Sequence, residues 1–172
     1  MILRAIKLAL LAGAGVAAWK AVNRQSPGSF FEQALRSGAG EVEAARSAQL
    51  RGASAEVRRF AQQLEHDHNE LNERLAEAGG LEVPEPDARQ QAMLRGLEAH
   101  QGLAYDRGWL RHMARSHARA ISLYQRTVDQ AGPGAQAASQ ALPKLREHAR
   151  KVEELQLSAA QPAPSAEPQA TI

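Results

Sequence analysis

Four long stretches of the sequence place apolar side chains at steps of three and four residues, and Gly or Pro interrupts the chain between them. This spacing puts the apolar side chains along one face of an α-helix. Ala and Leu are abundant, and no segment alternates as a strand would. The stretches cover residues 29–51, 54–79, 102–131 and the segment from the 132–134 turn to about 157. The sequence therefore predicts an all-α fold.

The connection between the second and third long helices determines the predicted architecture. It spans roughly 20 residues, contains Pro84 and Pro86, and carries a shorter amphipathic piece over 87–98. A connection of this length can cross the whole bundle, as in ferritin-like folds. We therefore predict a ferritin-like four-helix bundle with a long connection and a short extra helix. Pro143 is expected to start the fourth long helix or to kink it.

Both ends of the chain differ from the helical region over 29–157. Arg4 and Lys7 precede an unbroken apolar run, Leu8 to Trp19, so residues 1–25 are expected to be a signal peptide or a membrane anchor. The bundle would then lie on the periplasmic side of the cell envelope, and would stay attached to the membrane if this segment is retained. An N-terminal soluble helix is the alternative. Residues 158–172 are Pro- and Ala-rich and are expected to form a disordered tail.

Composition excludes several classes of function. The net charge is +2 and no concentrated basic run with interleaved aromatic residues occurs, so we expect no nucleic-acid partner. The absence of cysteine excludes disulfides and thiolate chemistry. No Gly-rich phosphate loop follows a strand, and no nucleophile elbow is found. The N-terminal segment is the one expected membrane contact, and the sequence identifies no protein partner.

Three histidines, His68, His117 and His148, each fall on the apolar stripe of a different long helix. A helix rises about 1.5 Å per residue, so the distance of a residue from the connecting turn gives its height in the bundle. His117 lies about 15 residues before the turn at Gly132, and His148 lies about 16 residues after it. The two are therefore expected at one level near the middle of the bundle.

The first two helices bring further groups to that level. His68 lies about 16 residues after Gly52, and Glu41 lies about 11 residues before it. Glu65, three residues before His68, belongs to the same layer and completes a Glu-x-x-His pair. Asp106 is eleven residues from His117, roughly 16 Å along the axis, and is expected to form hydrogen bonds near the bundle end instead.

Several short motifs occur in a characteristic order. They are Glu41-Val42-Glu43, Phe60-Ala61 with Asp67-His68, Tyr105-Asp106 through Trp109-Leu110 with Met113 and His117, and Leu142-Pro143-x-Leu145-x-x-His148. In this order and spacing, over about Phe30 to Leu155, the chain resembles the bacterial ferritin-like family known as domain of unknown function 4142. The resemblance implies a ferritin-like bundle behind an N-terminal export signal, in a membrane or envelope protein. It implies no established activity.

The ligand set differs from that of a di-iron carboxylate protein. Such proteins use a Glu from each of two helices and a Glu-x-x-His pair from each of the other two. Here Leu145 stands three residues before His148, so the second pair is missing, and the third helix supplies His117. Three imidazoles with Glu41 or Glu65 suit one zinc, copper or iron ion.

Two functions remain open from the sequence. The first is metal binding at mid-bundle, for metal handling or stress protection, by His68, His117, His148 and either Glu41 or Glu65. No catalytic residues are assigned, and an oxidase-type activity would require a bound redox metal. The alternative is a structural or interaction bundle of the envelope, in which the histidines form a buried hydrogen-bond network.

Overall fold

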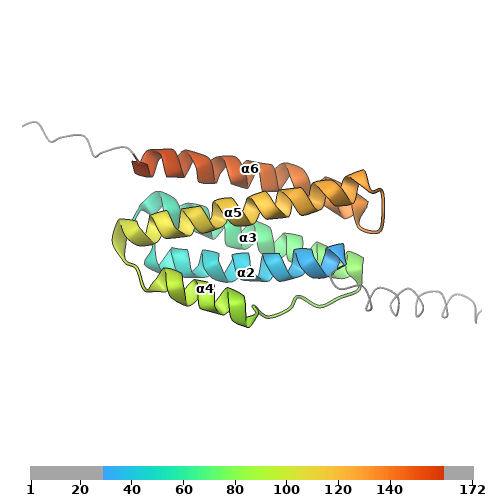
Figure 1. The fold of residues 1–172 in the computed structure, drawn as a ribbon, viewed down its shortest axis with the longest axis horizontal. Coiled ribbons are helices and arrows are strands. Elements are labelled where there is room, and N and C mark those ends of the chain that lie inside the picture. The colour runs from blue at the N-terminus through green and yellow to red at the C-terminus, as the bar shows by residue number, and fades with distance from the viewer. Residues whose placement is uncertain (1–28, 161–172) are drawn as a thin grey trace, which may run out of the picture.

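The computed structural model describes residues 29–160, and all regular structure in that range is helical. The helices are α2 (Phe30–Arg51), α3 (Ala55–Gly79), α4 (Ala88–Glu98), α5 (Gly102–Asp129) and α6 (Ala135–Ala160). Four long helices pack as a bundle, and the short α4 lies between α3 and α5 in the chain (Figure 1). This confirms the predicted four-helix bundle with an extra helix in its long connection. The predictions for residues 1–25 and for most of the 158–172 tail lie outside the described residues.

The bundle consists of two hairpins. Helices α2 and α3 form one and α5 and α6 form the other, and α4 packs on the outside against α2 and α5 (Figure 1). Helices α2 and α5 are antiparallel: Phe30 stacks edge-on against Tyr124, whereas Trp109 Nε1–H donates to the carbonyl of Ala44 over 2.8 Å. Glu41 on α2 therefore lies opposite the middle of α5.

Side-chain caps fix where the helices of the first hairpin begin. Ser29 and Glu32 form a capping box at the start of α2, and the Ser54 hydroxyl accepts from the backbone N–H of Val57 at the start of α3. Helix α3 ends at Gly80, whose φ of 61° is a left-handed conformation that glycine adopts readily. These boundaries agree with those expected from the sequence.

The apolar interior is divided into two clusters by a polar layer. One cluster surrounds Phe60, Trp109 and Met113, and the other surrounds Phe31 and Tyr124. Between them, along all four long helices, lie buried polar side chains: Glu41, His68, Asn72, Ser116, His117 and His148. The bundle thus carries hydrophobic cores on both sides of a polar centre.

Some details of the helices differ from expectation. Helix α6 begins at Ala135 rather than at Pro143, continues through this proline and extends to Ala160. Pro143 lacks a backbone N–H and its ring crowds the carbonyl four residues earlier, but it lies on the exposed side of α6. The buried Ala138, Leu142 and Leu145 pack the inner face of the helix on both sides of it. Leu103 follows the apolar spacing of α5 in the sequence, yet it is 59% exposed because it lies in the first turn of the helix. Among residues 29–160, no helix is long and apolar enough to cross a membrane.

Candidate metal centre

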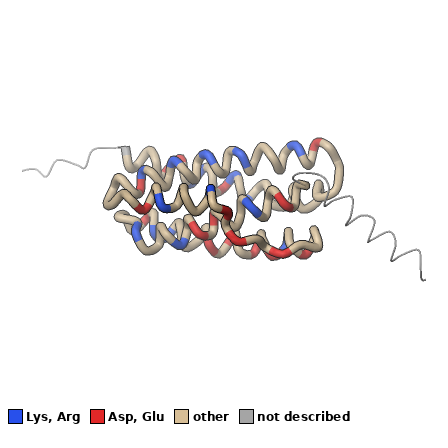
Figure 2. Tube along the Cα trace, turned by 60° about the horizontal axis from the view of Figure 1, so that its bottom comes forward, with Lys and Arg blue, Asp and Glu red and all other residues tan. Residues whose placement is uncertain are grey.

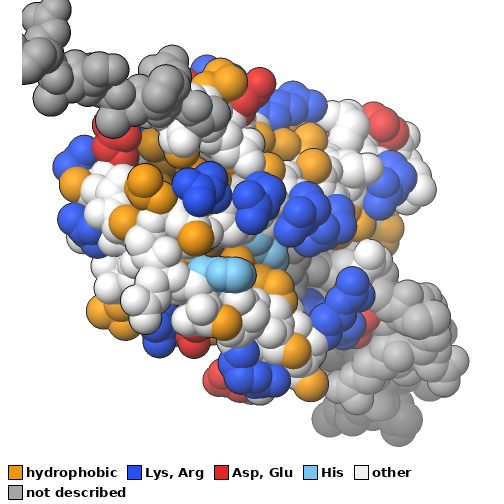
Figure 3. All heavy atoms as spheres, turned by 60° about the vertical axis from the view of Figure 1, so that its left-hand side comes forward, with side chains coloured by type: hydrophobic (Ala, Val, Ile, Leu, Met, Phe, Trp, Pro, Cys, Tyr) orange, Lys and Arg blue, Asp and Glu red, His pale blue; other side chains and the backbone are white. Residues whose placement is uncertain are grey.

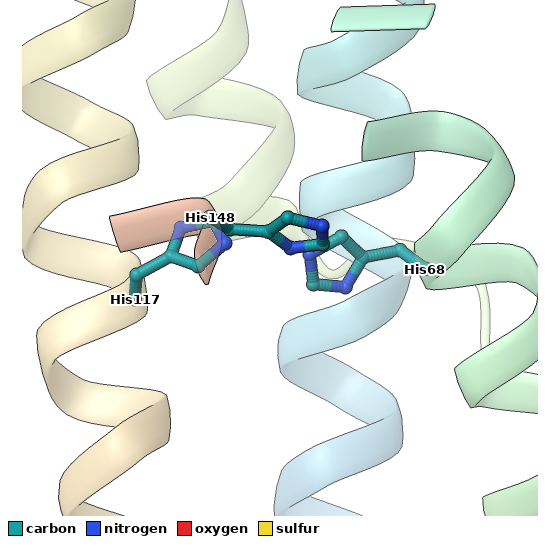
Figure 4. Close-up of side chains that lie close together, drawn as sticks. All are labelled: His68, His117 and His148. Carbon is teal, nitrogen blue, oxygen red and sulfur yellow. The ribbon is translucent and has the colours of Figure 1, made fainter. Parts of the chain in front are cut away.

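Three imidazole rings from three helices meet at mid-bundle. The ring centroids of His68 on α3, His117 on α5 and His148 on α6 are 5.4–5.5 Å apart in each pairing. One nitrogen from each ring lies within 4.8 Å of the other two, and all three side chains are buried. Figure 4 shows the rings turned toward one another. The cluster could hold a metal ion, and counting residues from the turns predicted this shared level.

The remaining long helix, α2, contributes a carboxylate to the same site. Glu41 is 2% exposed. Its Oε2 lies 3.0 Å from Nε2 of His68 and 3.9 Å from Nε2 of His117. Its Oε1 accepts hydrogen bonds from the hydroxyls of Ser116, at 2.5 Å, and Ser37, at 3.1 Å. The two serines hold one carboxylate oxygen, and the other faces the histidines.

Two of the three histidine rings are oriented by hydrogen-bond acceptors that do not belong to the metal centre. The Nδ1 of His117 lies 3.0 Å from the carbonyl of Met113, and Nε2 of His148 lies 2.9 Å from Oδ2 of Asp67. A carbonyl or carboxylate oxygen only accepts, so each of these nitrogens carries a proton, and a neutral ring then presents a lone pair on its opposite nitrogen. Metal-binding histidines are commonly oriented in this way.

Several polar atoms of the centre lack a partner in the described part of the chain. They are Oε2 of Glu41, both ring nitrogens of His68, Nε2 of His117 and Nδ1 of His148. The 3.0 Å contact between Glu41 and His68 is close, but it lacks the alignment of a hydrogen bond. Buried polar atoms without partners are unfavourable and rare in native proteins. A cation at the centre would satisfy several of them together.

The protonation states also suit a cation. Burial raises the pKa of the Glu41 carboxyl, but His68, His117 and the two serine hydroxyls together lower it further, to about 2. Burial lowers the pKa of His68 from 6.5 to about 4, and burial likewise lowers the pKa of His148. At neutral pH the buried Glu41 carboxylate is therefore charged, and the imidazole of His68 that faces it is neutral. Metal ligation requires these forms.

Glu65, the alternative carboxylate, does not join the histidines. Its oxygens accept from Nε of Arg46 at 2.7 Å and from Nε2 of Gln49 at 2.6 Å, and its side chain is 26% exposed. Because Glu65 lies three residues before His68, its side chain is rotated by about 60° from that of His68 around the helix axis. Glu65 therefore lies at the outer edge of α3. Glu41 is the carboxylate at the centre.

The other acidic residues have structural contacts. Asp67 accepts a hydrogen bond from His148 and lies outside the group of three histidines. Asp106 accepts from the backbone N–H groups of Ala53 and Ser54, each at 2.9 Å, which confirms its expected place at the bundle end.

Sequence reasoning missed the two serines that hold Glu41. Ser37 stands one helical turn before Glu41, a spacing that brings side chains together and that could have indicated the contact. Ser116 contacts Glu41 only across the packed faces of α2 and α5, and no local pattern indicates it.

Fold and site together define a helical-bundle protein with a buried centre of three histidines and one carboxylate. The model of the family described as domain of unknown function (DUF4142) matches residues 12–155, and the chain belongs to this family. No curated protein and no solved structure shows significant similarity to the chain.

Proposed function

We propose that the bundle binds one divalent transition-metal ion between His68, His117, His148 and Glu41. The observation that carries this proposal is the set of buried, unpartnered donor atoms that converge from all four long helices. Independent packing accidents would not be expected to leave such atoms at one level. The negative charge of Glu41, buried beside the neutral imidazole of His68, also favours a cation because an isolated buried charge is costly.

The donor set restricts which ion is bound. Three imidazole nitrogens and one carboxylate oxygen suit zinc, copper or iron, and suit magnesium or calcium poorly. Metal–nitrogen bonds of about 2.0–2.1 Å place tetrahedral donors about 3.3 Å apart. The histidine nitrogens lie within 4.8 Å of one another, so binding would draw the rings together by up to about 1.5 Å. Ring rotation and small helix shifts would bring about this change.

A four-donor site enclosed by two hydrophobic clusters suits holding an ion more than turning over a substrate. We therefore propose metal handling or protection against metal stress, with a ferritin-like bundle as the scaffold. The proposed location is the cell envelope, supported by the apolar run from Leu8 to Trp19 that follows Arg4 and Lys7. The same segment would provide membrane contact if it is retained.

The test is metal content by elemental mass spectrometry. The full chain is purified without chelator after growth with zinc, copper and iron, beside H68A/H117A/H148A. A matched control, H66A/H100A, removes two exposed histidines. Near-stoichiometric metal in the wild type and the control, with none in the triple variant, is the expected result. A metal-free wild type would refute the proposal.

A second candidate is a structural bundle whose histidines form a buried polar network. The hydrogen bond of His148 to Asp67 and that of His117 to the Met113 carbonyl favour it, because both rings are already fixed. This candidate requires a triple variant H68L/H117L/H148L at least as stable as the wild type, since buried polar networks can often be replaced by apolar side chains. It also requires that chelators leave the stability unchanged.

A further inference from the structure

A groove on the outside of the bundle leads from solvent to the buried centre. It has a volume of about 920 Å³ and lies between α2, α4 and α5, with Glu41 and His68 among the side chains that line it. This size is typical of small-molecule sites. Figure 3 shows a row of basic side chains beside a hollow in which histidine side chains are visible.

Arginines line both sides of the groove. Arg115 and Arg119 extend from α5, Arg36 from α2 and Arg89 from α4, with Arg126 further along α5. The antiparallel contacts Phe30–Tyr124 and Glu41–Ser116 place Arg36 level with Arg119. A hydrogen bond of 2.6 Å from Gln90 Nε2 to the Arg36 carbonyl joins α4 to α2 at the same level. Basic side chains from three helices thus surround one part of the groove.

These guanidinium groups have no acidic partners. Within residues 29–160, none of Arg36, Arg89, Arg115 and Arg119 forms an ion pair. Asp87, which also lines the groove, accepts from the backbone N–H of Gln90 as the cap of α4. The Glu41 carboxylate accepts hydrogen bonds from Ser37 and Ser116. Among the described residues, the arginines that line the groove outnumber its two carboxylates, Glu41 and Asp87, so an excess of positive charge remains.

The arginines of α5 form a longer row. Arg107, Arg111, Arg115 and Arg119 follow one another at four-residue steps, and no ion pair involves any of them in the described range. Like charges at this spacing destabilise a helix by about 0.2–0.5 kcal/mol per pair. Figure 2 shows basic positions spread along the bundle rather than gathered at one end. A row that disfavours the helix and lacks partners indicates a ligand of opposite charge.

We propose that the groove binds a small oxyanion with several negative charges, of the phosphate or polycarboxylate type, between Arg115 and Arg119 on one side and Arg36 and Arg89 on the other. Arginine is suited to this because its planar fork donates two parallel hydrogen bonds to a carboxylate or phosphate. The exposed Ser122, which accepts from Arg126, and the half-buried Gln90 add neutral polar groups to the lining. The proposal goes beyond metal binding and does not require it.

The row on α5 provides a matched test. Arg115 and Arg119 line the groove, whereas Arg107 and Arg111 continue the same row outside it. The variants R115Q/R119Q and R107Q/R111Q therefore remove equal charge from one helix at the same spacing. Isothermal titration at low ionic strength measures the binding of inorganic phosphate, and separately of citrate, to full-length, chelator-treated protein.

We expect saturable binding of at least one of these oxyanions, with one site per chain. In R115Q/R119Q the dissociation constant should rise about tenfold or more, whereas in R107Q/R111Q it should change by about twofold at most. The phosphate and citrate titrations show which oxyanion class the groove prefers. H117A/H148A removes two of the three imidazoles of the metal centre, and neither residue lines the groove. This variant should bind the anion as the wild type does, so that the anion result does not depend on the metal site. No saturable binding of either oxyanion, or an equal loss in both double variants, would overturn the proposal. Equal loss would mean that the whole row attracts anions without a site.

Discussion

The carboxylate of Glu41 and the imidazole of His68 face each other between α2 and α3, with Oε2 3.0 Å from Nε2 and neither side chain more than 3% exposed. An acid and a base this close would normally form a hydrogen-bonded ion pair, yet these atoms are not aligned as one. At neutral pH the acid is charged and the base is not, because the pKa of Glu41 is about 2 and that of His68 is about 4. The geometry and charges of the two side chains thus suit the binding of a shared cation better than a hydrogen-bonded ion pair between them.

Substitution of Glu41 by glutamine should weaken metal binding. Gln keeps the size of the side chain and an oxygen that accepts from Ser37 and Ser116, but it removes the charge. We expect the affinity for Zn²⁺ to fall about tenfold or more, measured by competition with a chromophoric chelator. The control is E43Q on the same helix, because Glu43 lies outside the centre and pairs with Arg46. An E41Q protein that binds Zn²⁺ like E43Q would exclude the carboxylate as a ligand.

Acid should destabilise the metal-free bundle below pH 6.5. Burial lowers the pKa of His68 from 6.5 to about 4, so between these values the unfolded chain binds more protons than the folded one. The free energy of unfolding therefore decreases as the pH falls through this window, by up to about 3 kcal/mol. The lowered pKa of His148 acts in the same direction.

Urea denaturation at pH 7.5, 5.5 and 4.5 measures this dependence. In H68Q the decrease in stability over the window should be smaller, while H66A, which removes an exposed imidazole, should behave as the wild type does. A wild-type stability that stays constant from pH 7.5 to 4.5 would contradict the neutral, buried state of His68.

Asp67 should support metal binding without touching the ion. It accepts a hydrogen bond from Nε2 of His148 at 2.9 Å, which orients the ring and makes its other nitrogen a better donor. In D67N we expect Zn²⁺ affinity to fall about 10- to 100-fold, with the one-to-one stoichiometry retained. E70Q is the control, because Glu70 pairs with the exposed side chains of His66 and Arg74 on the same helix. Wild-type affinity in D67N would show that Asp67 is only a packing contact.

Asp106 should contribute to stability and not to the metal centre. Both of its oxygens accept from backbone N–H groups at the start of α3, and its side chain is 2% exposed. D106A removes the acceptor of two partly buried backbone N–H groups, those of Ala53 and Ser54, and should lower the free energy of unfolding by about 1–2 kcal/mol. Zn²⁺ affinity should be unchanged, since Asp106 lies roughly 16 Å along α5 from His117. D129A, at an exposed position of the same helix, should leave the stability within about 0.5 kcal/mol of the wild type.

The position of a residue along the bundle axis was predictable from the sequence. The side of the helix on which its side chain lies was less predictable. Counting from Gly52 and Gly132 placed the three histidines and Glu41 at one level because straight antiparallel helices convert residue number into distance. The same counting admitted Glu65, which points away. Telling Glu41 from Glu65 requires the rotation of each helix about its axis, and that rotation is set by packing across the bundle.

Contacts between distant segments were also beyond the sequence. The hydrogen bond of Ser116 to Glu41 joins residues 75 positions apart, and that of Asp67 to His148 joins residues 81 apart. The arginines of α5 escaped a search for basic runs because three other residues separate each from the next. The arginines form a row only when the segment is helical. The packing of α2 and α4 beside α5 then determines that Arg115 and Arg119 line the groove.

The candidate metal centre takes one side chain from each long helix, Glu41 and His68 from the first hairpin and His117 and His148 from the second. Such a site does not exist in either hairpin alone. An ion bound there would join the two halves of the molecule at their midpoint, so release of the ion and separation of the halves would be linked equilibria. Metal occupancy would then control how readily the bundle opens, and a partner that binds the opened form would in effect sense the metal supply.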